Sequence, residues 1–285
     1  MTHAESPLDQ PYPQLPFWRT VGLSYSTYFH HLIDALRASW LWLVVVGALP
    51  VLASWQQWSG IGEVTANIAA GELPPMPISA GSVVFYSGEY ILLSLASVSI
   101  AVAWHRLMIL NEQPGFSGCN VTTRSLWRYL ATASALFLIL FLPLAAIMPP
   151  TFYFHQLASG PSQEFSVLRL VGCVVVNMLA IAVILRLALL LPAQAIGDIG
   201  LTFKQTWNRT RGNTWRLFWG MVITGVPPGL VLQMVFLFFI RLSPTGEAFE
   251  DVIAIMTSLL FLPIWIGFLS HAYRHFFQAP LRFPD

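Results

Sequence analysis

Residues 168–191 read LRLVGCVVVNMLAIAVILRLALLL, and this stretch decides the fold class. Its two charged residues, Arg169 and Arg186, lie toward its two ends. A helix of about 20 mostly apolar residues can cross the hydrocarbon core of a bilayer, whereas a transmembrane strand would show about ten residues of alternating polarity. The stretch therefore predicts a membrane-spanning helix.

Five further stretches have the same character, so the sequence predicts an all-α, polytopic membrane bundle of about six transmembrane helices. The predicted spans are 38–56, 83–104, 128–148, 168–191, 216–240 and 252–272. They form one membrane domain over residues 17–276. We expect disordered tails over 1–16 and 277–285.

The composition excludes a water-soluble domain. Of the 285 residues, 56% are hydrophobic and 9% are charged, whereas a soluble domain carries about 25% charged residues because its surface faces water. The net charge of +1 provides no basic field for nucleic acid, so no nucleic-acid partner is expected. The only cysteines, Cys119 and Cys173, form no CxxC pair and indicate no disulfide or zinc framework.

The distribution of positive charge predicts the orientation. If the N-terminus is inside, all but two of the 14 Lys and Arg residues fall on the cytoplasmic side, and the exceptions are Arg169 and Arg241. Cytoplasmic loops of membrane proteins carry such an excess of cations. Residues 1–16 are polar and do not resemble a signal peptide. We expect a multi-pass protein of a bacterial inner membrane with both termini in the cytoplasm.

Two amphipathic helices are predicted at the inner membrane interface. The first carries apolar side chains at helical spacing before the first span, namely Val21, Tyr25, Tyr28, Phe29, Leu32 and Leu36. The second begins at Asp198 as N-cap and runs through Ile199, Phe203 and Trp207, with Lys204 and Arg211 on its polar side. The alternative is that both are ordinary docking helices of a membrane bundle.

A weak repeat suggests three tandem hairpin units. Three arginines precede outgoing helices, and each is followed three or four residues later by tryptophan; the pairs are Arg37 and Trp40, Arg124 and Trp127, and Arg211 and Trp215. Interfacial anchoring by Arg and Trp explains the pattern equally well.

Five prolines are predicted to bend the spans, since proline frees a backbone carbonyl inside a helix. They are Pro50, Pro143, Pro227, Pro228 and Pro263. One interpretation is a cavity or hinge within the membrane. The alternative is the general enrichment of proline in transmembrane helices.

Charged residues within spans form a second candidate site, because they are costly at membrane depth. Glu89 is expected near the outer end of the second span, at a depth comparable to Arg169 and Arg241. An intramembrane ion pair between Glu89 and one of these arginines is one hypothesis. The other is that Glu89 lies at the headgroup level.

A polar cluster is predicted at the cytoplasmic face, formed by His31, Asp34, His105, His271 and His275. His271 and His275 share one face of a helix, as metal-ligating pairs do. However, the intervening sequence lacks the glutamate of a metalloprotease helix, and Arg274 would repel a cation. We therefore predict no metal, no cofactor and no catalytic residue.

Three stretches carry a family resemblance: RLALLLPA at 186–193, WNRTRGNTWR at 207–216 and WHRLMILNE at 104–112. They resemble a group of uncharacterised bacterial six-helix inner-membrane proteins. That group is similar to the membrane domain of glycerophosphoryl-diester phosphodiesterases. The resemblance implies a six-helix fold in a lipid setting. It implies no reaction, because the hydrolytic domain is absent from this chain.

Three functional hypotheses follow. The first is a non-enzymatic, lipid- or envelope-related membrane protein that binds or moves an amphipathic molecule, with membrane lipids as its partners. The second is an accessory subunit or assembly factor bound to other membrane proteins. The third is a membrane enzyme acting on lipid headgroups, which requires His31, Asp34, His105 and His275 to converge on one pocket.

Overall fold

The computed structural model describes residues 13–48, 80–115, 123–147, 167–242 and 247–278, and these residues form helices and connecting turns without a strand. The helices are α1 (Phe17–His30), an unlabelled helix at Leu32–Ala48, α3 (Ala80–Leu110), α4 (Thr123–Ile147), α6 (Val167–Leu187), α7 (Leu190–Ile196), α8 (Phe203–Arg209), α9 (Thr214–Leu242) and α10 (Glu247–Phe277). The all-α prediction is therefore confirmed for this part of the chain.

Three helical segments in the described residues are long and apolar enough to cross a membrane: Ser87–Leu110, Val175–Ile196 and Val252–Phe277. A fourth results if α1 and Leu32–Ala48, which meet at a bend of 72°, count as one span. These segments indicate a membrane protein. The number six stays a prediction.

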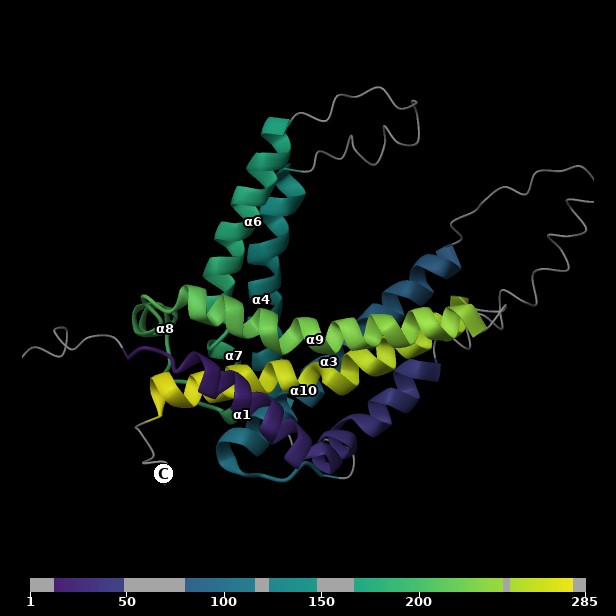
Figure 1. Ribbon diagram of the computed structural model, residues 1–285, viewed down its shortest axis with the longest axis horizontal. Coiled ribbons are helices and arrows are strands. Elements are labelled where there is room, and N and C mark those ends of the chain that lie inside the picture. The colour runs from purple at the N-terminus through teal and green to yellow at the C-terminus, as the bar shows by residue number, and fades with distance from the viewer. Residues whose placement is uncertain (1–12, 49–79, 116–122, 148–166, 243–246, 279–285) are drawn as a thin grey trace, which may run out of the picture.

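The helices form two groups that meet at one end (Figure 1). In the first group, α10 packs against α1, α3 and α9. In the second, α4 and α6 form a hairpin that contacts α7, α3 and α9. The hairpin lies close to the first group near α7 and α8, and the two groups separate toward their other ends (Figure 1). We call the end where the two groups meet the converging end.

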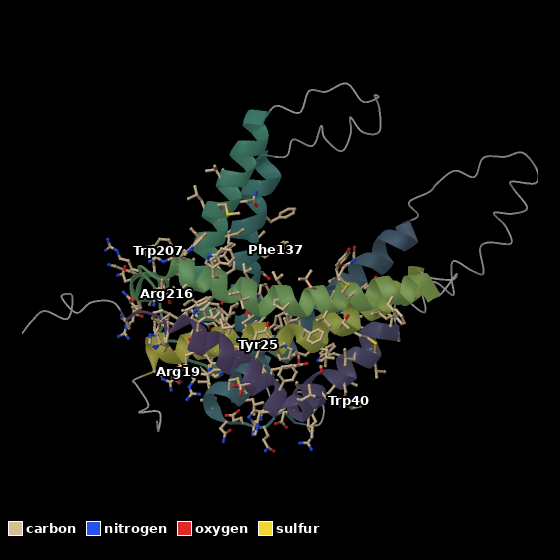
Figure 2. All side chains as sticks on the ribbon, viewed as in Figure 1. Arg19, Tyr25, Trp40, Phe137, Trp207 and Arg216 are labelled. Atoms are coloured by element: carbon tan, nitrogen blue, oxygen red, sulfur yellow. The ribbon has the colours of Figure 1, made fainter. Side chains whose placement is uncertain are left out.

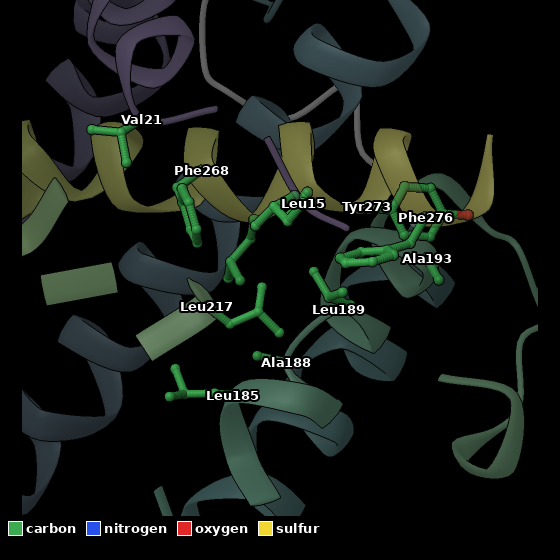
Figure 3. Close-up of a cluster of buried hydrophobic side chains, with 12 residues drawn as sticks. Leu15, Val21, Leu185, Ala188, Leu189, Ala193, Leu217, Phe268, Tyr273 and Phe276 are labelled. Carbon is green, nitrogen blue, oxygen red and sulfur yellow. The ribbon is translucent and has the colours of Figure 1, made fainter. Parts of the chain in front are cut away.

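A large buried cluster lies at the converging end and joins several helices (Figure 3). Leu15, Leu189, Leu217 and Phe268 are all 0% exposed. A Cβ atom at Gly220 would lie 2.0 Å from the Phe268 ring, so only glycine permits this approach of α9 to α10. Small residues allow such close helix packing in membranes.

The first predicted amphipathic helix is interrupted at His31, where the chain bends. The buried face of α1 consists of Thr20, Val21, Ser24 and Tyr28. The hydroxyls of Thr20 and Ser24 donate to backbone carbonyls four residues earlier, at 2.9 and 2.8 Å. Because both hydroxyl donors have partners in their own helical segment, Thr20 and Ser24 can lie on the buried face of α1, which packs against α10.

The predicted span 168–191 continues as two helices, since α6 ends at Leu187 and α7 begins at Leu190. Pro192 has no N–H to donate to the Ala188 carbonyl. That carbonyl accepts from the Leu191 amide at 3.0 Å instead, which closes a tight turn.

The N-cap of α8 is Thr202, and not Asp198 as the sequence suggested. Thr202 and Gln205 form a reciprocal capping box that satisfies two backbone amides. The Asp198 carboxylate accepts from the Gly200 amide at 3.1 Å and from the Tyr273 hydroxyl at 2.8 Å.

Candidate functional site

Four helices present their C-terminal carbonyls at the converging end, and arginines from other helices donate to them. The four bonds run from Arg186 to the Trp207 carbonyl, from Arg209 to the Phe276 carbonyl at 2.8 Å, from Arg274 to the Met108 carbonyl at 3.4 Å, and from Arg106 to the Ala195 carbonyl at 3.3 Å. They link α6 to α8, α8 to α10, α10 to α3, and α3 to α7. We call this series the arginine chain.

The arginine chain has a clear electrostatic cause. The last carbonyls of a helix have no partner within that helix, and the helix dipole makes this end negative. A guanidinium supplies several fixed donors and a permanent positive charge. Helices as short as α7 and α8 are unstable alone, so these contacts hold them in place. Much of the positive charge at this end therefore has a structural role.

Arg186 makes the most extensive of these contacts. Its guanidinium lies 3.6 Å from the centre of the Trp207 ring, a cation–π geometry. Its Nε donates to the Thr210 hydroxyl at 3.2 Å. Thr206 and Thr210 are 0% exposed, so one face of α8 is buried while Trp207 remains partly open. Arg186 thereby fixes which face of α8 points outward.

The N-terminal residues 13–16, which we call the N-terminal strap, lie against the start of α9 although a tail was expected here. The Asn213 side chain accepts from the Leu15 amide at 2.9 Å and donates to the Pro13 carbonyl at 3.1 Å. Arg216 donates to the Leu15 carbonyl at 2.7 Å. The strap is therefore held against α9, and its Leu15 is part of the core. Sequence analysis missed it, although an asparagine before a helix is a familiar cap signal.

The five residues of the predicted polar cluster do not converge on one pocket. His31 bonds to Asp34 at 3.0 Å, and Arg37 lies 3.5 Å from the same carboxylate. Among the described residues, this is the only hydrogen bond that joins two members of the predicted cluster. Within the described residues, no group of three or more His, Cys, Asp or Glu side chains is placed to hold a metal ion.

His105 and His271 each form hydrogen bonds between helices. His105 is 0% exposed, and its Nδ1 lies 2.7 Å from the Ser270 hydroxyl while its Nε2 lies 3.4 Å from the Tyr129 hydroxyl. His105 therefore connects α3 with α10 and α4. His271 Nε2 lies 3.2 Å from the Thr27 hydroxyl, which connects α10 with α1. These contacts are typical interhelical hydrogen bonds.

His275 shows a different environment. Its Nε2 is buried without a hydrogen-bond partner among the described residues.

The predicted prolines lie within helices where the structure describes them. Pro227 and Pro228 are inside α9, Pro263 is inside α10, and Pro143 falls within the bounds of α4. Pro50 lies outside the described residues.

Pro227 leaves one backbone carbonyl of α9 without its helical hydrogen-bond donor, and a side chain of another helix supplies the donor. Because proline has no N–H, the carbonyl of Ile223 lacks its usual partner four residues later. The Tyr25 hydroxyl of α1 donates to this carbonyl at 2.7 Å. A proline in α9 is thus matched by a tyrosine in α1, although Tyr25 and Ile223 are 198 residues apart in sequence.

We expect Tyr25→Phe to lower the free energy of unfolding by about 1–3 kcal/mol, because it leaves the Ile223 carbonyl unpaired. In a Pro227→Ala background the helix regains its own N–H donor at position 227, so the loss should shrink. Unfolding in mixed micelles, followed by tryptophan fluorescence, measures both values. Tyr90→Phe is the control, since Tyr90 is 69% exposed. Equal losses in the two backgrounds would refute the pairing.

The predicted ion pair involves Glu89 and one of two arginines. Glu89 lies in α3, whereas the side chains of Arg169 and Arg241 lie outside those that the structure describes. The pair stays a prediction.

Comparison with known proteins does not extend these findings: no family model, no curated protein and no solved structure matched the chain.

Proposed function

We propose that the chain is a non-enzymatic integral membrane protein whose diverging helices bind or move an amphipathic molecule such as a lipid. The observation that supports this is the set of large apolar side chains exposed on the two helix groups, which diverge as Figure 1 shows; Phe137 of α4 is labelled in Figure 2. The exposed side chains include Phe137 at 59%, Leu179 at 63%, Leu230 at 59% and Met234 at 70%. They come from α4, α6 and α9.

Exposed apolar surface on this scale is unfavourable in water, at roughly 25 cal/mol for each Å². Soluble monomers rarely expose large contiguous apolar patches. In a bilayer, acyl chains cover the same side chains without that penalty. Acyl chains can therefore cover the exposed side chains of α4, α6 and α9, which supports lipids as partners.

The arrangement also supports the proposed topology of six spans with both termini in the cytoplasm. The C-termini of α3 and α10 lie at the converging end with the start of α9. These are the ends that the charge distribution assigns to the cytoplasm. In addition, α4 and α9 have 25 and 29 residues, which is enough to span a bilayer.

The setting we propose is a bacterial inner membrane, with lipids as the main partners and no nucleic acid. It rests on the excess of cytoplasmic cations and on the resemblance to six-helix inner-membrane proteins related to the membrane domain of glycerophosphoryl-diester phosphodiesterases. No hydrolytic activity is proposed.

Cysteine labelling tests the topology. Cys119→Ser and Cys173→Ser together remove the native thiols, and Ser162→Cys or Asn208→Cys then adds one. In spheroplasts, we expect a membrane-impermeant maleimide to label the cysteine at position 162. We expect it to label position 208 only after the membrane is opened. Labelling of position 208 in intact spheroplasts would contradict the orientation.

Native mass spectrometry of protein extracted gently from its own membrane tests the ligand. A discrete lipid adduct that survives detergent exchange is the expected result. A protein partner at fixed stoichiometry would instead favour the accessory-subunit function, since a partner helix could also cover the apolar surface of α4 and α6.

A further inference from the structure

The outward face of α8 combines cations with exposed aromatic side chains. Phe203 and Trp207 are 55% and 39% exposed, and Lys204 and Arg211 are exposed beside them. The opposite face carries the fully buried Thr206 and Thr210. We use the name α8 face for Phe203, Lys204 and Trp207 of α8 together with Arg211 in the turn that follows the helix. Trp207 marks its position at the converging end (Figure 2).

The charge of this region is unbalanced. Residues 199–216 contain four cations and no Asp or Glu. Two of the cations are used by the fold, because Arg209 donates to the Phe276 carbonyl and Arg216 to the Leu15 carbonyl. The side chains of Lys204 and Arg211 make no hydrogen bond or ion pair with the described residues.

We propose that the α8 face binds the phosphate of an anionic phospholipid. Lys204 and Arg211 would contact the headgroup phosphate, because charge-assisted hydrogen bonds from cations to phosphate are strong. Phe203 and Trp207 would contact the glycerol and upper acyl region, where aromatic side chains are favoured. Basic sites beside transmembrane helices on the cytoplasmic side recognise anionic headgroups in this way.

The fold prepares this site before any lipid binds. The capping box at Thr202 fixes the start of α8, and Arg186 fixes its end through the Trp207 carbonyl and Thr210. Ordering a binding surface in advance lowers the entropy lost on binding. The aromatic residues also favour a lipid over free phosphate, which has no apolar part for them to contact.

The proposal rests on the membrane location proposed above and is tested on the purified full chain. Native mass spectrometry with added phosphatidylglycerol or phosphatidylcholine gives an apparent affinity for each lipid. We expect tighter binding of phosphatidylglycerol. Because each cation near an anionic surface contributes about 1 kcal/mol, Lys204→Gln or Arg211→Gln should weaken it about fivefold, and the double variant about 25-fold.

A matched control removes the same charge elsewhere. Arg124→Gln with Arg128→Gln deletes two cations from the start of α4 and should leave phosphatidylglycerol affinity near that of the wild type. An equal loss in this control would show a general charge effect and overturn the proposal. An unchanged thermal unfolding midpoint establishes that each variant is folded.

Two further outcomes would overturn the lipid assignment. One is equal affinity of the wild-type chain for the two lipids. The other is displacement of phosphatidylglycerol by inorganic phosphate at the same concentration, which would identify a phosphate site. Both leave the cysteine-labelling result unaffected, so failure here is distinguishable from failure of the proposed membrane topology.

Discussion

Phe268→Ala should lower the free energy of unfolding by about 3 kcal/mol. Phe268 is 0% exposed and packs in the cluster that joins α9 and α10 at the converging end. Buried Phe→Ala changes in soluble cores cost about 3–5 kcal/mol. We expect the lower end here, because the hydrophobic share of this cost is smaller in a bilayer while the lost packing contacts remain. Denaturation in mixed micelles provides the measurement.

The contact between Phe268 and Gly220 allows a sharper test. Gly220→Ala places a methyl group against the ring and should cost about 1–3 kcal/mol. In the Phe268→Ala background the ring is absent, so Gly220→Ala should cost little or even stabilise the helix. The two losses should therefore be strongly non-additive.

Each variant in this test has a matched control. Gly229→Ala adds a methyl group to the same helix where nothing lies within 4 Å, so it should not destabilise the protein. Phe137→Ala removes a ring that is 59% exposed and should have a small effect. Additive losses for Gly220→Ala and Phe268→Ala would show that α9 and α10 do not pack as described.

Leu15→Ala is expected to lower the free energy of unfolding by about 2 kcal/mol or more, within the range for buried leucines. Leu15 belongs to the N-terminal strap and is 0% exposed in the core cluster at the converging end. A disordered tail, as expected from sequence, would make this substitution silent. The same unfolding measurement therefore distinguishes the two descriptions directly.

Asn213→Ala tests how the strap is held. It removes the acceptor for the Leu15 amide and the donor to the Pro13 carbonyl, so protease should cleave the N-terminus more rapidly. Leu179→Ala is the control for Leu15→Ala, because Leu179 is 63% exposed on α6. If Leu15→Ala and Leu179→Ala have equal effects on stability, the strap does not contribute to the core.

The apolar pattern of the sequence determined the all-helical class and the approximate position of most long helices. Predicted spans 83–104, 216–240 and 252–272 lie within α3, α9 and α10. This succeeds because a membrane-spanning segment must satisfy its backbone hydrogen bonds internally and needs a fixed apolar length. Both requirements are local, so each can be recognised from a single stretch of residues.

The contacts at the converging end depended on tertiary structure. The sequence grouped His31, His105 and His271 on one face, but it could not assign each a different partner. It also marked Pro227 as a break without indicating that Tyr25 would supply the missing donor. Likewise, four of the cations counted toward orientation donate to helix C-terminal carbonyls through the arginine chain. Such pairings join residues distant in sequence, and only the packing of helices brings them together.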